Sequence, residues 1–326
     1  MSETASVLVT GAAGFIGSHL IDSLLAQGSE VTGIDNLSRG RLDNLSEALD
    51  HPRFRFQHGD LADLDSLSAM MSGRRFDTVW HLVANSDIPA GVLDPRVDLK
   101  DTFLTTFNLL AVMRETGAKQ LAFASTSAIY GVHESPLHED MGPLFPISNY
   151  GAMKLASEAL ISASVESFLE RAWIFRFPNV IGPRATHGII YDLLGKLSHG
   201  PSDLEVLGDG TQSKPYLHVS ELIDAMLVIT ERAQDRLNWF NIGPPDEGAT
   251  VREIAEAVRD EAAPAMPIRF TGGDRGWIGD VPKFRYSIEK LRQLGWSPRL
   301  TSREAVVRAV GEIRREFDIP QLVCSS

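Results

Sequence analysis

Hydrophobic runs recur along the first half of the chain and alternate with stretches of helical periodicity. The runs are nearly continuous, which is typical of strands that are buried on both faces of a parallel sheet. They lie at residues 6–10, 30–35, 54–60, 77–83, 119–126 and 172–180. The segments between them, such as 18–28 and 99–117, carry apolar residues three and four positions apart. This alternation predicts an α/β fold of the Rossmann type, with a doubly wound parallel sheet.

The pattern changes after Gly182, where turn-forming residues become frequent. Short strands are predicted at 204–207 and 239–243, and helices at 220–233, 250–262 and 302–317. We therefore expect a Rossmann domain over 1–182 that carries the catalytic residues. A smaller C-terminal α/β lobe over 183–326 is expected to bind the substrate, with an approximate boundary and interleaved segments.

Composition and charge narrow the classes of function. Hydrophobic residues make up 43% of the chain and charged residues 23%, which is ordinary for a globular protein. The net charge of −12 argues against non-specific binding to nucleic acid or to anionic membranes. The single cysteine excludes an intrachain disulfide or a cysteine-based metal site, and we expect no metal. Because neither a signal peptide nor a membrane span is predicted, we expect a cytoplasmic protein.

Three glycines follow the first predicted strand and open a helix, namely Gly11, Gly14 and Gly17. Glycines in such a strand–loop–helix unit allow a tight turn and let the backbone approach a pyrophosphate at the positive helix N-terminus. Phe15 and Ile16 lie in the same turn and are expected to contact the ligand as well. The spacing therefore predicts a dinucleotide site.

Carboxylates after the second and third predicted strands indicate which dinucleotide binds. Asp35 is expected to accept hydrogen bonds from the adenosine ribose and to repel a 2′-phosphate, which favours NAD over NADP. Arg39 is the nearby residue that could weaken this preference. Asp60 and Leu61 are expected to meet the adenine. The other expected cofactor contacts are Asn36, Ser38, Gly40, Leu82, Ala84, Ser125 and Phe177.

Tyr150 and Lys154 lie four residues apart in a predicted helix over 148–170. At this spacing their side chains share one helix face. An ammonium favours the phenolate and lowers a phenol pKa that starts near about 10, so Tyr150 is expected to act as a base. A surface tyrosine beside a solvated lysine would have the same spacing, and the neighbouring motifs must decide between the two interpretations.

Seven motifs run in order along nearly the whole chain: TGAAGFIG, GDLAD, ASTSAIYG, YGAMK, FRFPNVIGPR, GDGTQSKPYLHV and RGWIGDVP. Together they resemble the extended short-chain dehydrogenases/reductases that act on nucleotide sugars, and UDP-hexose 4-epimerases in particular. The resemblance implies NAD as the cofactor and a UDP-sugar as the substrate. It implies inversion of carbon 4 of UDP-glucose/UDP-galactose or of UDP-glucuronate/UDP-galacturonate, through a transient 4-keto sugar.

The resemblance also implies roles for single residues. Tyr150 is the catalytic tyrosine, Lys154 holds the nicotinamide ribose and lowers the pKa of Tyr150, and Thr126 bonds the 4-hydroxyl of the sugar. The implied substrate contacts are Thr126, Ser127, Asn179, Arg184, His187, Lys214 and Arg275. A homodimer is implied, paired through helices at about 97–116 and 148–170. The candidate interface residues are Leu104, Leu160 and Ile161.

Other activities on the same framework remain as alternatives. A 4,6-dehydratase needs an Asp-Glu pair after the catalytic threonine, and a decarboxylase usually keeps an acid there, whereas this chain has Ser127 and Ala128. A reductase would more often prefer NADP, against Asp35. A non-catalytic NAD-binding regulator would have no need of a tuned phenol. Near the nicotinamide the chain departs from the family at Asn85 and Thr102, whose roles the sequence does not assign.

Overall fold

The computed structural model describes residues 4–133, 136–273 and 284–317. The chain divides into two compact units. The first comprises the described parts of 1–132, 139–177 and 223–240, and the second comprises those of 133–138, 178–222 and 241–326. The units interleave because the chain returns to the first unit after entering the second.

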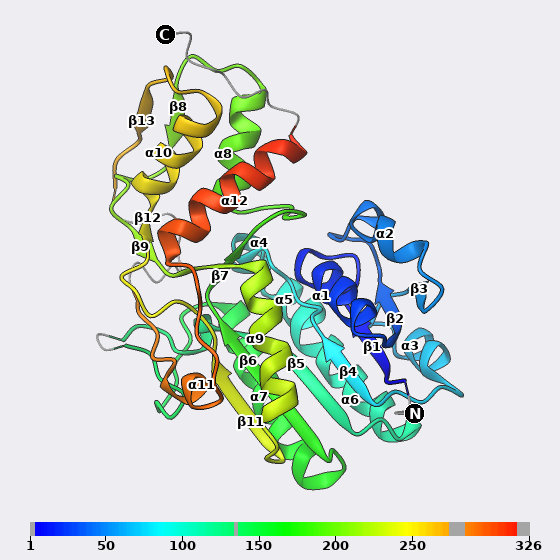
Figure 1. The fold of residues 1–326 in the computed structure, drawn as a ribbon. Helices are drawn as coiled ribbons and strands as arrows, with labels where there is room; N and C mark the ends of the chain where they lie inside the picture. Colours follow the sequence, from blue (N-terminus) through cyan, green and yellow to red (C-terminus); the bar gives the residue numbers. More distant parts are fainter. Residues whose placement is uncertain (1–3, 134–135, 274–283, 318–326) are drawn as a thin grey trace. The chain divides into compact units, whose positions relative to one another are not determined.

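The first unit is built on a seven-stranded sheet with the order β11-β6-β5-β4-β1-β2-β3 (Figure 1). All neighbouring pairs from β3 to β6 are parallel. The strand order reverses between β1 and β4, and ligands of such sheets bind beyond the strand ends at this point. The strands are β1 (Ser6–Thr10), β2 (Glu30–Asp35), β3 (Phe54–His58), β4 (Thr78–His81), β5 (Gln120–Thr126), β6 (Arg171–Phe177) and β11 (Leu237–Asn241). The predicted Rossmann-type sheet is confirmed.

Helices connect these strands, and three of them share one buried core with the sheet. Apolar side chains of α3, α6 and α7 pack against those of β1, β2, β4, β5 and β6. The helices of this unit are α1 (Phe15–Ala26), α2 (Ser46–Leu49), α3 (Leu64–Met71), α4 (Ile88–Leu93), α5 (Pro95–Asp98), α6 (Thr105–Thr116), α7 (Asn149–Ser167) and, in its larger part, α9 (Val219–Arg232). Short 3₁₀ turns lie at η1 (Leu42–Leu45) and η3 (Ser127–Ile129), and a π-helical segment at η2 (Leu99–Leu104).

The second unit has its own core, formed mainly by three amphipathic helices. Helices α8 (Ile189–Ser198), α10 (Val251–Ala262) and α12 (Ser302–Glu316) pack together with β8 (Leu204–Val206). Capping boxes begin α10 at Thr250 and α12 at Thr301, and they satisfy N–H groups that the helices leave unpaired. The remaining elements are β7 (Asn179–Ile181), β9 (Ser213–Lys214), β10 (Tyr216–His218), β12 (Ala249–Thr250), β13 (Ile268–Phe270) and α11 (Glu289–Gln293).

Three elements differ from the sequence-based prediction. The single strand expected at 172–180 is two strands, β6 in the first unit and β7 in the second, with Pro178 between them. The strand expected at 239–243 in the second lobe is β11, which forms the edge of the large sheet next to β6. The long helix expected over about 97–116 is divided, because η2 winds as a π-helix before α6 begins at Thr105. Hydrophobic periodicity detects helix but does not distinguish one winding from another, and π segments often lie at functional sites.

Candidate functional site

The loop between β1 and α1 is too tight for side chains at two of its glycines. Gly11 has a φ of +72°, in the left-handed region that favours glycine. A Cβ atom on Gly17 would lie 2.0 Å from the carbonyl oxygen of Gly11, so the first turn of α1 lies directly against the loop. Gly14 is the N-cap of α1, and the partly exposed Phe15 and Ile16 follow it. This arrangement suits a pyrophosphate at the helix N-terminus.

Asp35 ties this loop to the end of β2. Its Oδ2 atom accepts a hydrogen bond from the N–H of Ala13 at 3.0 Å, and its Oδ1 atom accepts one from the N–H of Leu37 at 2.7 Å. A Cβ atom on Gly40 would lie 3.0 Å from Oδ1 of Asp35, which places Gly40 beside the same carboxylate. Burial raises the pKa of Asp35, while the two N–H donors oppose that rise.

The side chain of Arg39 pairs with a carboxylate other than that of Asp35. Its guanidinium forms an ion pair with Asp87 at 2.8 Å. Next to it, the N–H of Ser38 donates to Oδ1 of Asn36 at 3.0 Å. The residue expected to weaken the preference for NAD therefore has a carboxylate partner of its own.

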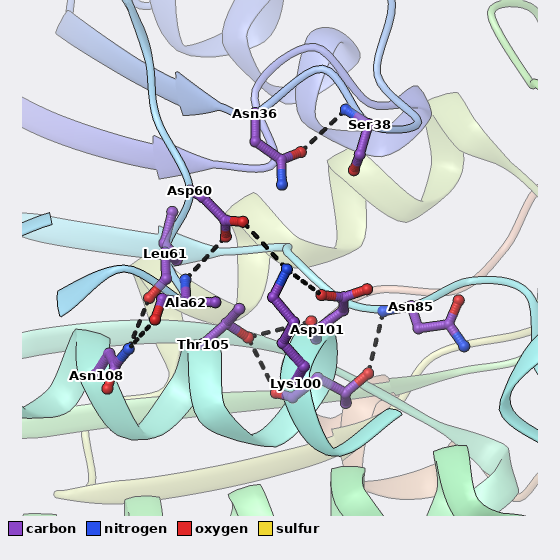
Figure 2. A network of polar contacts seen from close by, with 11 residues as sticks. Asn36, Ser38, Asp60, Leu61, Ala62, Asn85, Lys100, Asp101, Thr105 and Asn108 are labelled. Carbon is purple, nitrogen blue, oxygen red and sulfur yellow. Dashed lines mark hydrogen bonds and ion pairs between the residues drawn. The ribbon is translucent and has the colours of Figure 1, made fainter. Parts of the chain in front are cut away.

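A polar network joins the end of β3 to η2 and α6 (Figure 2). Asp60 accepts a hydrogen bond from the N–H of Ala62 at 2.9 Å, and Nζ of Lys100 lies 3.4 Å from its carboxylate. Lys100 also lies 3.7 Å from Asp101. Burial alone would raise the pKa of Asp60, but the Ala62 N–H and Lys100 together lower it below its ordinary value. Asn108 fixes the adjacent backbone by donating to the carbonyl oxygen of Leu61 at 2.9 Å.

The segment after β4 contains the residues that the sequence left unassigned. The hydroxyl of Thr102 accepts a hydrogen bond from the N–H of Asn85 at 3.0 Å. The side chain of Asn85 donates to Asp98 at 2.8 Å. Asp98 is buried, and its Oδ2 atom has no hydrogen-bond partner among the residues that the structure describes. Asn85, Thr102 and Asp98 therefore form one buried cluster. The backbone of Leu82, shortly before Asn85, is held to the end of β1, since its N–H donates to the carbonyl oxygen of Thr10 at 3.2 Å.

The predicted catalytic side chains come together where β5 ends and α7 begins. Ser148 caps α7 by accepting a hydrogen bond from the N–H of Gly151 at 3.1 Å. One face of the helix then presents Tyr150, which is hydrogen-bonded to the side chain of Thr126. Lys154, one turn later, donates to the carbonyl oxygen of Ala124 at 2.6 Å. Tyr150 is thus in contact with Thr126, and Lys154 reaches the same strand two residues earlier, at Ala124.

The other predicted residues near this group differ in their contacts and exposure. Phe177 pairs with Thr126 across β5 and β6, and Ser127 begins the 3₁₀ turn η3. Ser125 is only 1% exposed, and its hydroxyl donates to Glu158 rather than into an open site. Ala84 lies two residues beyond Leu82 and is partly exposed.

The pKa values at this group differ from the expectation. Burial raises the pKa of Tyr150 to about 12, the hydrogen bond from Thr126 opposes the rise, and the charge of Asp98 adds to it. Burial also lowers the pKa of Lys154 to about 7. The net shift of the Tyr150 pKa is thus upward in this structure, and burial is its largest cause. Loss of solvation is the largest cause of both shifts.

The predicted substrate residues of the second unit lie on short strands and loops. Asn179 is exposed at the start of β7 and pairs with Tyr216, and Lys214 lies two residues before Tyr216 in β9. Arg184 has a φ of +66°, and its N–H donates to Glu316 at 2.7 Å. His187 is exposed, and Arg275 lies outside the described residues.

Two searches of the described ranges bear on other kinds of site. No cluster of three or more His, Cys, Asp or Glu side chains in these ranges could hold a metal ion. No described helix is long and apolar enough to cross a bilayer.

Comparison with known proteins accounts for this arrangement. A family model described as the NAD dependent epimerase/dehydratase family matches residues 7–243. The chain belongs to this epimerase/dehydratase family. The family's dependence on NAD confirms the predicted cofactor, and the range of the match includes both the glycine loop and the Tyr150 helix.

Individual members of the epimerase/dehydratase family match nearly the whole chain. The UDP-glucose 4-epimerase of Azospirillum brasilense is 32% identical, covering 96% of this chain and 92% of its own length. The solved UDP-glucose 4-epimerase of Thermus thermophilus, in complex with NAD, is 31% identical with a TM-score of 0.82, covering 95% of this chain and 99% of its own. The UDP-glucuronic acid 4-epimerase of Bacillus cereus, solved with UDP-glucuronic acid and NAD, is 25% identical with a TM-score of 0.85 and covers the same shares. The predicted resemblance to UDP-hexose 4-epimerases is confirmed.

Sequence analysis missed several residues that build the site. Lys100 and Asn108 hold the Asp60 segment, and Asp98 holds Asn85. Glu158 accepts a hydrogen bond from Ser125 and pairs with Arg176. The one signal available was the position of Glu158, which is four residues beyond Lys154 on the same helix face.

Proposed function

We propose that this protein is an NAD-dependent UDP-sugar 4-epimerase, an isomerase that inverts carbon 4 through a transient 4-keto sugar. The observation that carries the proposal is the group of Tyr150, Thr126 and Lys154 at the carboxyl end of β5. Family membership and the named relatives support it. The lack of an acid at Ser127 and Ala128 favours epimerisation over dehydration or decarboxylation.

Tyr150 exchanges a proton with the 4-hydroxyl of the sugar, and the hydroxyl of Thr126 orients both oxygens by hydrogen bonding. When bound, NAD would supply the hydride-accepting and hydride-donating chemistry that oxidation and re-reduction at carbon 4 require. Because burial opposes the phenolate, the step needs positive charge nearby, and the Lys154 ammonium is this chain's contribution. Rotation of the 4-keto sugar between the two transfers produces the epimer.

The chain's residues fit NAD along the carboxyl edge of the large sheet. The glycine loop and the N-terminus of α1 would hold the pyrophosphate, and Asp35 the adenosine ribose. Asp60 and Leu61 would flank the adenine. The Asp35 carboxylate favours NAD over NADP, and the engagement of Arg39 with Asp87 supports that preference.

In the second unit we assign Asn179, Arg184, His187 and Lys214 to the nucleotide sugar. The lysine would meet a phosphate as a point charge rather than as a bidentate fork. The relatives include epimerases of a neutral hexose and of a uronate, so both substrate pairs are retained in the proposal. Arg275 is assigned to the pyrophosphate by resemblance alone.

A cytoplasmic homodimer is the proposed form of the enzyme. Leu99, Leu104 and Phe107 are exposed on η2 and α6, with exposed fractions of 51%, 36% and 49%. Ile161, which the sequence suggested for the interface, is fully buried in the core, and Leu160 packs against that core. The apolar surface on η2 and α6 is therefore the better candidate for the dimer contact.

The experiment is an NMR time course of the purified protein with UDP-glucose and, separately, with UDP-glucuronate. No NAD is added, because an epimerase regenerates the NAD that it retains. Conversion of either sugar into its 4-epimer supports the proposal, and the faster reaction identifies the substrate pair. Tyr150→Phe serves as the negative control. No conversion of either sugar, even with NAD added, would contradict the proposal.

A further inference from the structure

The charge of Lys154 depends on a finely balanced environment. The side chain is 1% exposed, and its ammonium donates to the carbonyl oxygen of Ala124 at 2.6 Å. The nitrogen also lies 4.6 Å from the centroid of the Phe123 ring, which attracts a cation. These contacts do not replace full hydration, and burial lowers the pKa of Lys154 to about 7. At neutral pH the ammonium is thus close to losing its proton.

Glu158 lies one helical turn beyond Lys154 and is itself buried. Three donors converge on its carboxylate. The hydroxyl of Ser125 donates to Oε1 at 2.5 Å, and Arg176 donates from Nε to Oε1 at 3.1 Å and from Nη2 to Oε2 at 2.7 Å. A bidentate pair of this kind is strong and fixes the geometry of the carboxylate. The negative charge is therefore held in one place beside the helix face that carries Lys154.

Arg176 is held in turn from its other side. Its Nη1 donates to the phenol oxygen of Tyr130 at 3.0 Å and to the carbonyl oxygen of Glu139 at 3.1 Å. Burial alone would lower the pKa of Arg176, but hydrogen bonding to Glu158 and the charge of Glu158 raise it, so the guanidinium keeps its proton. These contacts fix Arg176, and through it the Glu158 carboxylate.

The other ionisable groups around Lys154 do not supply a comparable negative charge. His81 lies on β4 and is neutral, because burial and the charge of Lys154 lower its pKa to about 3. Tyr150 on α7 holds its proton, since its pKa is raised to about 12. Asp98 of α5 acts on Tyr150, and Arg176 of β6 is positive. Among the described residues, the charge of Glu158 is the one that raises the pKa of Lys154 against burial.

We propose that Glu158 is a positioning residue that keeps the Lys154 ammonium charged, with Arg176 and Ser125 holding its carboxylate in place. The consequence for catalysis rests on the proposed epimerase function, whereas the effect on Lys154 itself does not. A buried ion pair is weak evidence of stabilisation. The proposal gives the Glu158–Arg176 pair a different role, which is to hold a negative charge near Lys154.

The direct test is Glu158→Gln, which preserves shape and removes the charge. Lysine labelled with ¹³C at Cε is incorporated, and Lys154 is titrated by NMR in the purified holoenzyme, its signal assigned by loss in Lys154→Arg. We expect the midpoint to move to lower pH by about one unit. The matched control is Glu166→Gln, on the same helix, whose carboxylate is exposed and pairs with Arg236. The control should leave the midpoint in place.

The pH profile of epimerisation gives the second readout. The limb where activity falls as pH rises through the Lys154 pKa should move to lower pH in Glu158→Gln and stay unchanged in Glu166→Gln. A Lys154 midpoint that is the same in Glu158→Gln and in the wild type would overturn the proposal. If the wild type shows no epimerase activity, the NMR titration still decides the role of Glu158.

Glu158→Gln leaves Arg176 as an uncompensated buried cation, which destabilises the fold independently of any effect on Lys154. Glu158→Gln combined with Arg176→Met removes both charges and avoids an isolated buried cation. The double variant should also titrate Lys154 at lower pH. A wild-type midpoint in the folded double variant would equally reject the proposal.

Discussion

The loop after β1 and the end of β5 belong to one sheet, yet different interactions hold them. Main-chain atoms hold the loop. Gly17 lies directly against the carbonyl of Gly11, where a Cβ atom would not fit, and two main-chain N–H groups donate to the Asp35 carboxylate. At the end of β5, buried side-chain charges hold one another, from Arg176 through Glu158 to the face of Lys154. A site for a tightly held cofactor can be built from rigid backbone, whereas a site that moves protons needs charges whose balance is set by neighbours.

The largest difference between the two regions should follow from Tyr150→Phe. Loss of the phenol removes the acid–base group, and we expect kcat to fall by about 10²–10⁴-fold. The loop after β1 is untouched, so the NAD content of the purified protein should equal that of the wild type. The control is Tyr191→Phe, which removes a phenol on α8 of the second unit. A Tyr150→Phe variant with wild-type kcat would remove Tyr150 from the chemistry.

Gly17→Ala should give the opposite result, because it should reduce the amount of bound NAD while leaving Tyr150 in place. The added methyl would lie 2.0 Å from the Gly11 carbonyl oxygen, and the backbone must shift at a cost of about 1–3 kcal/mol. We expect reduced NAD content and a lower Tm, measured by absorbance of the released cofactor and by thermal unfolding. Gly311→Ala, on α12, is the matched control, since the nearest neighbour of the added Cβ would be the Glu261 side chain of α10, 3.9 Å away. Equal NAD retention in the two variants would contradict the close packing of this loop.

The same contrast explains which parts could be predicted from the sequence. Gly11, Gly14 and Gly17 lie within one strand–loop–helix unit, and Asp35 follows at the end of the next strand, so local spacing carries the information. Tyr150 and Lys154 are likewise one turn apart on one helix. The parallel Rossmann sheet also follows from local runs of apolar residues.

The parts that could not be predicted depend on contacts between distant segments. Arg176 reaches Glu158 because β6 lies beside β5 and under α7, a neighbourhood that no local pattern encodes. Lys100, in the π-helical segment η2, meets Asp60, which lies beyond the end of β3 and 40 residues earlier in the chain. The same limit applies to the pKa of Tyr150, since spacing indicates a neighbouring lysine but not the loss of solvation that is the largest cause of the shift at each group.

Asp98→Asn should have a smaller effect, confined to the group of Tyr150, Thr126 and Lys154 at the end of β5. The charge of Asp98 raises the pKa of Tyr150, so its removal should lower that pKa by roughly half a unit, or ~0.7 kcal/mol. Because the base must lose its proton, the limb where activity rises with pH should move to lower pH. Asp101→Asn is the control, an exposed carboxylate on η2 that pairs with Lys100. A limb that moves to higher pH, or equally in both variants, would contradict the role of Asp98.

Lys100→Met should give the smallest effect, confined to the cofactor end. The Lys100–Asp60 pair is partly exposed, and such pairs contribute about 0.5 kcal/mol. If the pair steadies the segment that meets the adenine, NAD should dissociate about two-fold faster at low salt, and the difference should vanish at high salt because exposed charges are screened. The rate is measured as loss of bound NAD after dilution, with kcat at saturating NAD unchanged. Lys119→Met removes an exposed pair with Glu170, at 2.7 Å, and should leave retention unchanged. Faster loss that persists at high salt would mean that packing of the lysine stem, rather than its charge, holds this segment.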